Sequence, residues 1–127
     1  MTRTRHLEGP PPGESISEAQ FQRRVIGAAR VYGWRVNHQR PALNRSGRWS
    51  TATQGDIGFP DLVLARGGQV LIVELKTNRG RVSPEQRRWM TELGDLARLW
   101  RPRDWDNILD ELQAGPPPPS RTEGDHQ

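Results

Sequence analysis

Apolar residues recur at the spacing of one helical face between residues 17 and 33. Ser17, followed three residues later by Gln20, has the form of a capping box and marks the start of a helix. Gly33 ends this predicted helix, and residues 34–38 predict a first strand. The apolar stripe of the helix consists of Phe21, Val25, Ala28 or Ala29, and Tyr32.

Two apolar runs, residues 61–65 and 70–75, are separated by the short polar segment 66–69 that contains two adjacent glycines. Two such runs joined by a short glycine-containing turn predict a β-hairpin. Both faces of both runs are apolar. We therefore expect the hairpin to lie centrally in a sheet that is covered on both sides.

A second helix is predicted to begin at Ser83, which suits the N-cap position, with Pro84 at the first helical position. Its apolar pattern continues to about Leu96. Residues 97–100 then predict a short strand, which Pro102 ends because proline cannot donate a hydrogen bond to a neighbouring strand.

A last helix is predicted from Asp104, as its N-cap, through Leu112. Proline-rich segments flank the predicted elements, so we expect a disordered arm at 1–14, one folded domain at 15–113 and a disordered tail at 114–127. The order α-β-β-β-α-β-α predicts an α/β fold with a four-stranded mixed sheet flanked by helices.

The segment 39–57 is long, polar and basic. A loop of this length in a small domain is usually functional or disordered. The formal net charge of the chain is +4, and the excess lies within residues 15–113. Between residues 35 and 55 there are four arginines and no acid. This stretch favours an anionic partner such as nucleic acid, although many basic proteins bind nothing specific.

Several protein classes are excluded by what the sequence lacks. There is no cysteine, which excludes a disulfide scaffold and a cysteine-ligated zinc site. No apolar run reaches the roughly 18 residues that a membrane span needs, and the first residues contain no apolar stretch of the kind found in secretory signals. We expect a soluble, cytoplasmic protein.

Lys76 is the single lysine of a chain that holds eighteen arginines. Arginine is effectively always protonated, whereas a lysine can lose its proton when its surroundings lower its pKa. Codon bias and chance could produce the same composition. Lys76 lies two residues beyond Glu74, so both side chains project from the same face of the strand.

The hairpin register places Asp61 opposite Glu74, with their Cβ atoms about 5 Å apart. Like charges that face each other destabilise a sheet, and a divalent cation between them would reverse this effect. Mg²⁺ prefers carboxylate oxygens of this kind. The alternative is an ion-pair cluster with Lys76 at the end of a strand.

The segment Gly58-Phe59-Pro60-Asp61, followed after twelve residues by Glu74-Leu75-Lys76, resembles the PD-(D/E)XK nuclease superfamily. The wider pattern is similar to the virus-type replication-repair nuclease (VRR-NUC) family, and the match covers about residues 17–112. The motifs that carry it are Gly-x-Pro-Asp-Leu-Val-Leu, Val-Glu-Leu-Lys-Thr, Arg-Val-Ser-Pro-Glu-Gln-Arg-Arg-Trp and Trp-Arg-Pro-Arg-Asp-Trp.

The resemblance implies a metal-binding catalytic centre. It implies that Asp61, Glu74 and the backbone carbonyl of Leu75 bind Mg²⁺ or Mn²⁺, and that Lys76 orients or activates the attacking water. It also implies a further acid from the first helix, for which Glu18 is the candidate. The alternative for Glu18 is a first-turn acid that is stabilised by the helix dipole.

Two further side chains have a functional and a structural interpretation. Gln86 resembles the family's catalytic glutamine on the second helix, but it also stands three residues after Ser83, as in a capping box. His38 ends the first strand near the expected cleft, although a lone histidine is more often structural.

The candidate DNA-binding residues lie in two polar segments. Arginines would contact phosphates, and Trp49, in the polar loop, would stack on a base. The other tryptophans, at positions 34, 89, 100 and 105, are expected in the core or at its edge. The candidates for DNA binding are Arg40, Arg45, Arg48, Trp49, Arg79 and Arg81.

The sequence thus predicts a metal-dependent DNA endonuclease. The resemblance implies action on branched or junction DNA, in phage or bacterial replication and repair, and a homodimer. Two alternatives remain open: a general or restriction-like nuclease of duplex DNA, and a DNA-binding protein that kept the fold and lost catalysis.

Overall fold

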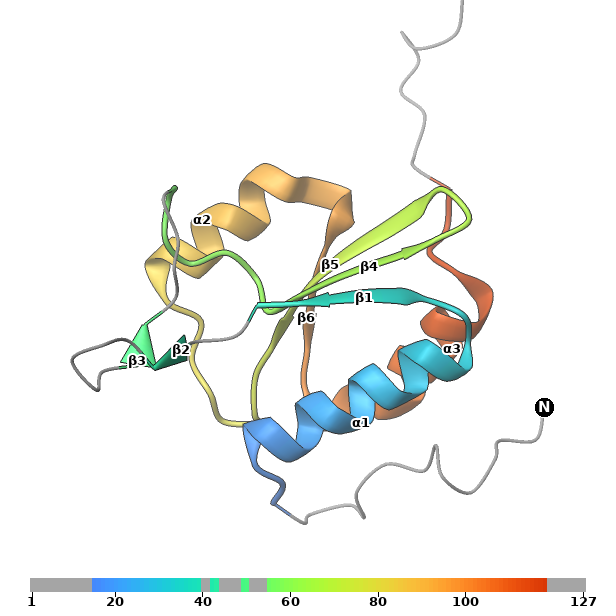
Figure 1. The fold of residues 1–127 in the computed structure, drawn as a ribbon, viewed down its shortest axis with the longest axis horizontal. Coiled ribbons are helices and arrows are strands. Elements are labelled where there is room, and N and C mark those ends of the chain that lie inside the picture. The colour runs from blue at the N-terminus through green and yellow to red at the C-terminus, as the bar shows by residue number, and fades with distance from the viewer. Residues whose placement is uncertain (1–14, 40–41, 44–48, 51–54, 119–127) are drawn as a thin grey trace, which may run out of the picture.

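The computed structural model describes residues 15–39, 42–43, 49–50 and 55–118, and of residues 42–43 and 49–50 it describes the backbone alone. Its elements follow the predicted order, with one additional pair of short strands (Figure 1). The elements are α1 (Glu18–Val31), β1 (Arg35–His38), β2 (Ala42–Leu43), β3 (Trp49–Ser50), β4 (Leu62–Arg66), β5 (Gln69–Leu75), α2 (Pro84–Leu93), η2 (Gly94–Leu96), β6 (Ala97–Trp100), η3 (Pro102–Asp104) and α3 (Trp105–Ala114).

The main sheet has four strands in the order β1-β4-β5-β6. β4 pairs antiparallel with β1 and with β5, whereas β6 runs parallel to β5. The sheet is therefore mixed, as predicted, and the hairpin strands β4 and β5 lie at its centre. The hairpin register is also the predicted one, because Leu64 pairs with Leu71 and Arg66 with Gln69.

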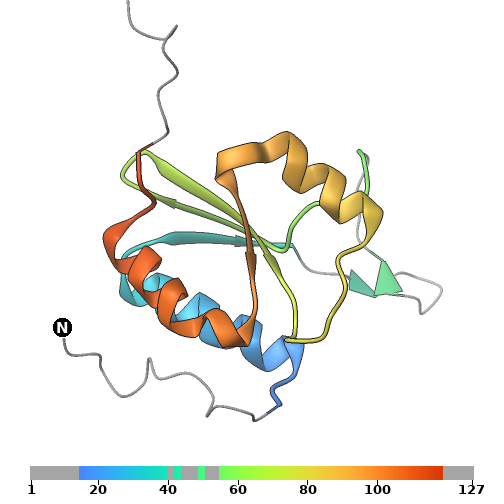
Figure 2. The same ribbon diagram turned by 180° about the vertical axis from the view of Figure 1, so that it is seen from behind.

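Helices cover both faces of the sheet. α1 and α3 lie side by side on one face and α2 lies on the other, as the two opposite views show (Figures 1 and 2). Successive strand residues point to opposite faces. On β5, Leu71, Val73 and Leu75 belong to the core between the sheet and α1 and α3. Glu74 therefore points to the face that α2 covers.

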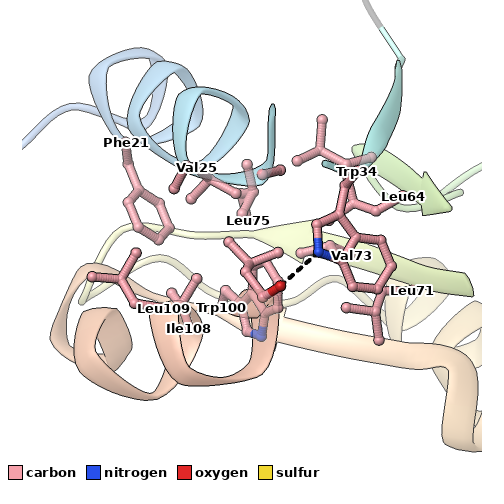
Figure 3. Close-up of a cluster of buried hydrophobic side chains, with 14 of the residues drawn as sticks. Phe21, Val25, Trp34, Leu64, Leu71, Val73, Leu75, Trp100, Ile108 and Leu109 are labelled. Atoms are coloured by element: carbon pink, nitrogen blue, oxygen red, sulfur yellow. Dashed lines mark hydrogen bonds between the residues drawn. The ribbon is translucent and has the colours of Figure 1, made fainter. Parts of the chain in front are cut away.

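The core lies between the sheet, α1 and α3 (Figure 3). Trp34 is buried there, and its indole Nε1 donates a 2.8 Å hydrogen bond to the carbonyl of Leu112 in α3. Trp100 and Trp105 are also buried, and Trp89 is half-buried. The predicted core or edge position of these four tryptophans is confirmed.

Both helix starts that were predicted from capping boxes are present. Ser17 caps α1 and Ser83 caps α2, each with the glutamine three residues later as its reciprocal partner. α2 ends at Leu93, three residues before the predicted end. Gly94 adopts a φ of 61°, and the chain continues as a 3-10 turn, η2, instead of further helix.

The last helix begins directly after Asp104, as predicted, but without the predicted side-chain cap. Asp104 makes no side-chain cap to α3. Its carboxylate Oδ2 instead accepts a 3.0 Å hydrogen bond from the backbone N–H of Arg101, which closes the 3-10 turn η3 before the helix. α3 also extends two residues beyond Leu112, to Ala114, and ends before Gly115 at φ 84°.

The predicted loop 39–57 contains a small separate sheet. β2 and β3 pair antiparallel, with Ala42 opposite Ser50 and Leu43 opposite Trp49. Strands of two residues are too short to produce an alternating pattern, so they could not be predicted from the sequence. The predicted arm 1–14 and the end of the predicted tail, 119–127, lie outside the described residues. No helix in the described part of the chain is long and apolar enough to span a membrane.

Candidate active site

The two predicted metal-binding acids meet at the open end of the central hairpin. Leu62 pairs with Val73 in the β4–β5 ladder, so one further step of the register brings Asp61 opposite Glu74. The Asp61 carboxylate Oδ2 accepts a 2.8 Å hydrogen bond from the backbone N–H of Leu75. This bond holds the Asp61 side chain across the end of β5, next to Glu74.

Glu74 is a buried carboxyl with one unpaired oxygen. Only 2% of its surface is exposed. Its Oε2 accepts a 3.2 Å hydrogen bond from Gln86 Nε2 and lies 3.5 Å from the ammonium of Lys76. Its Oε1 is buried and has no hydrogen-bond partner within the described part of the chain. Buried polar atoms without a partner are rare in native proteins, and such an atom can mark the place where an ion binds.

The surroundings of Glu74 raise the pKa of its carboxyl from 4.5 to about 8. Burial is the largest cause, because it disfavours the charged form, and the neighbouring charge of Asp61 raises the pKa further. The charge and the hydrogen bond of Lys76 lower the pKa but do not cancel the rise. A divalent cation at this position would favour the ionised carboxylate and so reverse the shift.

Gln86 has both of the roles that the sequence left open. Its Oε1 accepts a 2.9 Å hydrogen bond from the N–H of Ser83, which completes the capping box of α2. Its Nε2 donates to Glu74. The cap fixes which end of the amide faces Ser83, and the nitrogen is therefore the end that faces Glu74.

Gly58 allows α2 to approach the segment that leads into Asp61. It has a φ of 92°, and a Cβ atom at this position would lie 2.8 Å from the backbone carbon of Glu85. Phe59 packs edge-to-face on Trp89 of α2, with ring centroids 4.9 Å apart. In the sequence, Gly58 stands out only as part of a motif. Its positive φ and close contact show that it positions the start of α2, which carries Gln86.

Lys76 follows directly after β5 and is held from both sides. Its backbone N–H donates a 3.1 Å bond to the carbonyl of Trp100 in β6. Gly80 lies against its aliphatic chain, since a Cβ at Gly80 would be 3.4 Å from Lys76 Cδ. Its side chain is 14% exposed. The ammonium therefore reaches Glu74 and keeps limited access to solvent.

The comparison with protein families identifies a VRR-NUC domain at residues 31–97. The chain belongs to the VRR-NUC family. VRR-NUC is a nuclease domain of the PD-(D/E)XK type, and the mixed four-stranded sheet flanked by helices agrees with it. The matched range contains Asp61, Glu74, Lys76 and Gln86. The comparisons with curated proteins and with solved structures gave no match.

Glu18 is the one predicted acid of the VRR-NUC site that the structure does not bring into contact with the others. It is exposed in the first turn of α1. Both views place the start of α1 beside the segment that follows β5 (Figures 1 and 2). Among the described residues, however, no cluster of three acidic, histidine or cysteine side chains able to hold a metal ion is present.

His38 connects the last residue of β1 to α1 through a side-chain hydrogen bond. Its ring Nε2 forms a hydrogen bond with the side-chain amide of Gln22. This contact ties the end of β1 to the first helix and fits the structural interpretation.

The candidate DNA-binding residues of the VRR-NUC domain fall into two groups. Arg79 and Arg81 are exposed in the segment after β5. Trp49 lies in β3, and its side chain is outside what the structure describes. Arg40, Arg45 and Arg48 also lie outside the described residues.

Proposed function

We propose that the chain is a metal-dependent DNA endonuclease that hydrolyses phosphodiester bonds. The observation that carries this proposal is the Glu74 carboxyl, buried opposite Asp61: its Oε2 lies 3.5 Å from the single lysine, and its Oε1 has no partner among the described residues. Buried ion pairs that only stabilise a fold usually have hydrogen bonds to both carboxylate oxygens. The membership in a nuclease family supports the same conclusion.

The oxygen donors of this site fit a hard divalent cation such as Mg²⁺ or Mn²⁺. Asp61, Glu74 and the backbone carbonyl of Leu75 would hold it, and Glu18 is proposed as a further acid from the neighbouring start of α1. When bound, such a cation polarises a phosphate group and lowers the pKa of a bound water.

The residues of the chain would orient the reaction. Lys76 would hold the attacking water in line with the phosphorus by donating a hydrogen bond from its ammonium. Gln86 would keep the Glu74 carboxylate in one orientation, because its amide is fixed by the cap of α2. Catalysis then depends on α2 remaining docked against the end of the hairpin.

We propose branched or junction DNA as the substrate, in phage or bacterial replication and repair, and a homodimer as the active form. The arginines at positions 40, 45, 48, 79 and 81 would contact phosphates, and Trp49 would stack on a base. Phosphate contacts position a duplex without reading its sequence. Recognition of DNA shape is therefore more consistent with this small domain than a long sequence-specific site.

A cleavage assay tests the function. Supercoiled plasmid is incubated with the wild-type chain and Mg²⁺ or Mn²⁺, with and without EDTA, and in parallel with Asp61→Asn. We expect nicking by the wild type that EDTA and Asp61→Asn both abolish. Binding of DNA without any metal-dependent nicking would show a DNA-binding protein that has lost catalysis.

The preferred substrate is tested by a panel of labelled flaps, forks, four-way junctions and plain duplexes of matched sequence. We expect faster cleavage of at least one branched substrate than of the duplex. Equal rates on all of them would contradict structure selectivity and indicate a general or restriction-like nuclease.

A further inference from the structure

A cavity of about 540 Å³ lies between α2, β6 and the segment after Lys76. Its charged side chains are all arginines, and no acid lines it. We refer to it as the arginine cavity. Its lining residues are Gly80, Arg81, Val82, Arg87, Met90, Thr91, Leu99 and Arg101.

The positive charge of the arginine cavity is not compensated within the described residues. Arg81 and Arg87 are exposed, and neither side chain forms an ion pair there. The cavity on the other side of α2 has the opposite character, because Asp56, Glu85 and Glu92 outnumber Arg88 in its lining. The basic lining is therefore a local feature of one side of this helix.

Arg101 gives the arginine cavity a fixed wall. Its Nη1 donates 2.7 Å hydrogen bonds to the carbonyls of Thr77 and Gly80. The backbone N–H of Arg103 donates to the side chain of Asn78 in the same turn. The turn after Lys76 is thus fastened to η3, and one guanidinium of the cavity is held in place before any ligand binds.

The arginine cavity adjoins the proposed catalytic centre. Gly80 lines the cavity and lies against the aliphatic chain of Lys76. Leu99, another lining residue, is the partner of Glu74 in the parallel β5–β6 pair. Residues paired across a sheet project from the same face, so the cavity and the Glu74 carboxyl share one face of the sheet.

We propose that the arginine cavity is a subsite for a backbone phosphate of the substrate strand, next to the phosphate that is cleaved. The inference rests on the proposed function, which makes DNA the substrate, and it adds Arg87 and Arg101 to the residues that bind the DNA. Guanidinium groups bind phosphate oxygens through paired hydrogen bonds, and three arginines, one of them held in place, with no acid in the lining suit a single anion. A phosphate held there would fix the strand relative to Lys76.

The neighbouring residues Arg87 and Arg88 provide a matched test. Both are exposed on α2, but Arg87 lines the arginine cavity and Arg88 lines the acidic one. Binding of a fluorescent DNA duplex to wild type, Arg87→Gln and Arg88→Gln is measured by anisotropy in EDTA over a range of salt concentrations. Each phosphate contact contributes about 0.9 to the slope of log K against log salt.

We expect Arg87→Gln to weaken binding and to reduce the slope by about one, and Arg88→Gln to keep the wild-type slope. An unchanged slope in Arg87→Gln, or an equal reduction in both variants, would overturn the subsite. Circular dichroism shows whether both variants keep the fold. Because the DNA remains uncut in EDTA, the result is independent of turnover: a wild type that binds but does not cleave would contradict the proposed function alone.

Inorganic phosphate distinguishes a strand phosphate from a free anion. If phosphate stabilises the wild type against heat but not Arg87→Gln, while the DNA-binding slope of both is the same, the cavity binds a free anion and the strand assignment is wrong. Competition of phosphate with DNA in the wild type, and loss of this competition in Arg87→Gln, supports the assignment.

Discussion

Glu74 gives the metal-free protein a characteristic dependence on pH. Its carboxyl has a pKa of about 8 in the folded state instead of 4.5. Between these two values the folded state binds more protons than the unfolded state, so the free energy of unfolding falls as the pH rises. We expect the Tm in EDTA to fall over this pH range, and Glu74→Gln, which cannot titrate, to show a flatter dependence.

A divalent cation should remove most of this decrease in the free energy of unfolding, because it binds the ionised carboxylate of Glu74. Stabilisation by Mg²⁺ or Mn²⁺ should therefore grow as the pH rises toward 8. Titration calorimetry with Asp61→Asn is the control for the site. Equal metal binding by Asp61→Asn and the wild type would show that these two acids do not hold the ion.

Lys76 is expected to be essential for turnover and dispensable for binding. Arginine at this position keeps the charge, but its planar group is larger and cannot give up a proton. Lys76→Ala and Lys76→Arg should both lose cleavage by at least ~100-fold, the lower end of what a positioned acid–base group contributes. Both should bind DNA as the wild type does. Near-normal nicking by Lys76→Arg would show that the residue supplies positive charge alone.

The sequence predicted the pairing of Asp61 with Glu74 because the turn at the two adjacent glycines fixes the register of the hairpin. The sequence could not predict whether Gln86 caps α2 or contacts Glu74, because both roles require a glutamine at this position. It also missed Arg87 and Arg101 as neighbours. They are far apart along the chain, and only the packing of α2 beside β6 brings them to one cavity.

At the scale of elements, the docking of α2 depends on Gly58. Gly58→Ala would force an alanine into a φ of 92° and place its Cβ 2.8 Å from backbone atoms of Glu85. We expect a loss of about 1–3 kcal/mol in the free energy of unfolding. Cleavage should fall as well, because the start of α2 carries Gln86.

Gly27 is the matched control. It is exposed in the middle of α1, and a Cβ there would meet no atom within 4 Å. Gly27→Ala should raise the free energy of unfolding by about 0.5–1 kcal/mol. Urea unfolding curves measure both variants. A Gly58→Ala variant as stable as Gly27→Ala would show that α2 does not depend on this close contact.

Helix starts were easier to predict than helix ends and short strands. Ser17 and Ser83 are recognisable because a cap requires one residue at one position. α2 ends early because Gly94 takes a positive φ, a conformation open to glycine but not required by it. Asp104 occupies the predicted N-cap position of α3, but its carboxylate accepts a hydrogen bond from the preceding turn and not from the helix.

At the scale of the whole molecule, the order of the elements and the apolar faces of the hairpin were enough to predict the four-stranded mixed sheet. The position of Glu18 relative to Asp61 and Glu74 was not predictable in the same way. Glu18 lies on the helix that covers the opposite face, so its proposed role depends on how the start of α1 meets the end of β5.

The helices on the two faces of the sheet also differ in how much of their surface is buried. α1 and α3 bury side chains in the core, whereas α2 has no buried residue. Contacts that hold α2 are the packing of Trp89 on Phe59, the close approach of Gly58 and the bond from Gln86 to Glu74. Local opening costs least where few apolar contacts are lost. The amide hydrogens of α2 should therefore exchange with deuterium before those of α1 and α3. α2, which covers the Glu74 carboxyl, is then the helix that opens first, and in the proposed nuclease this would let a product strand leave without disturbing α1 and α3.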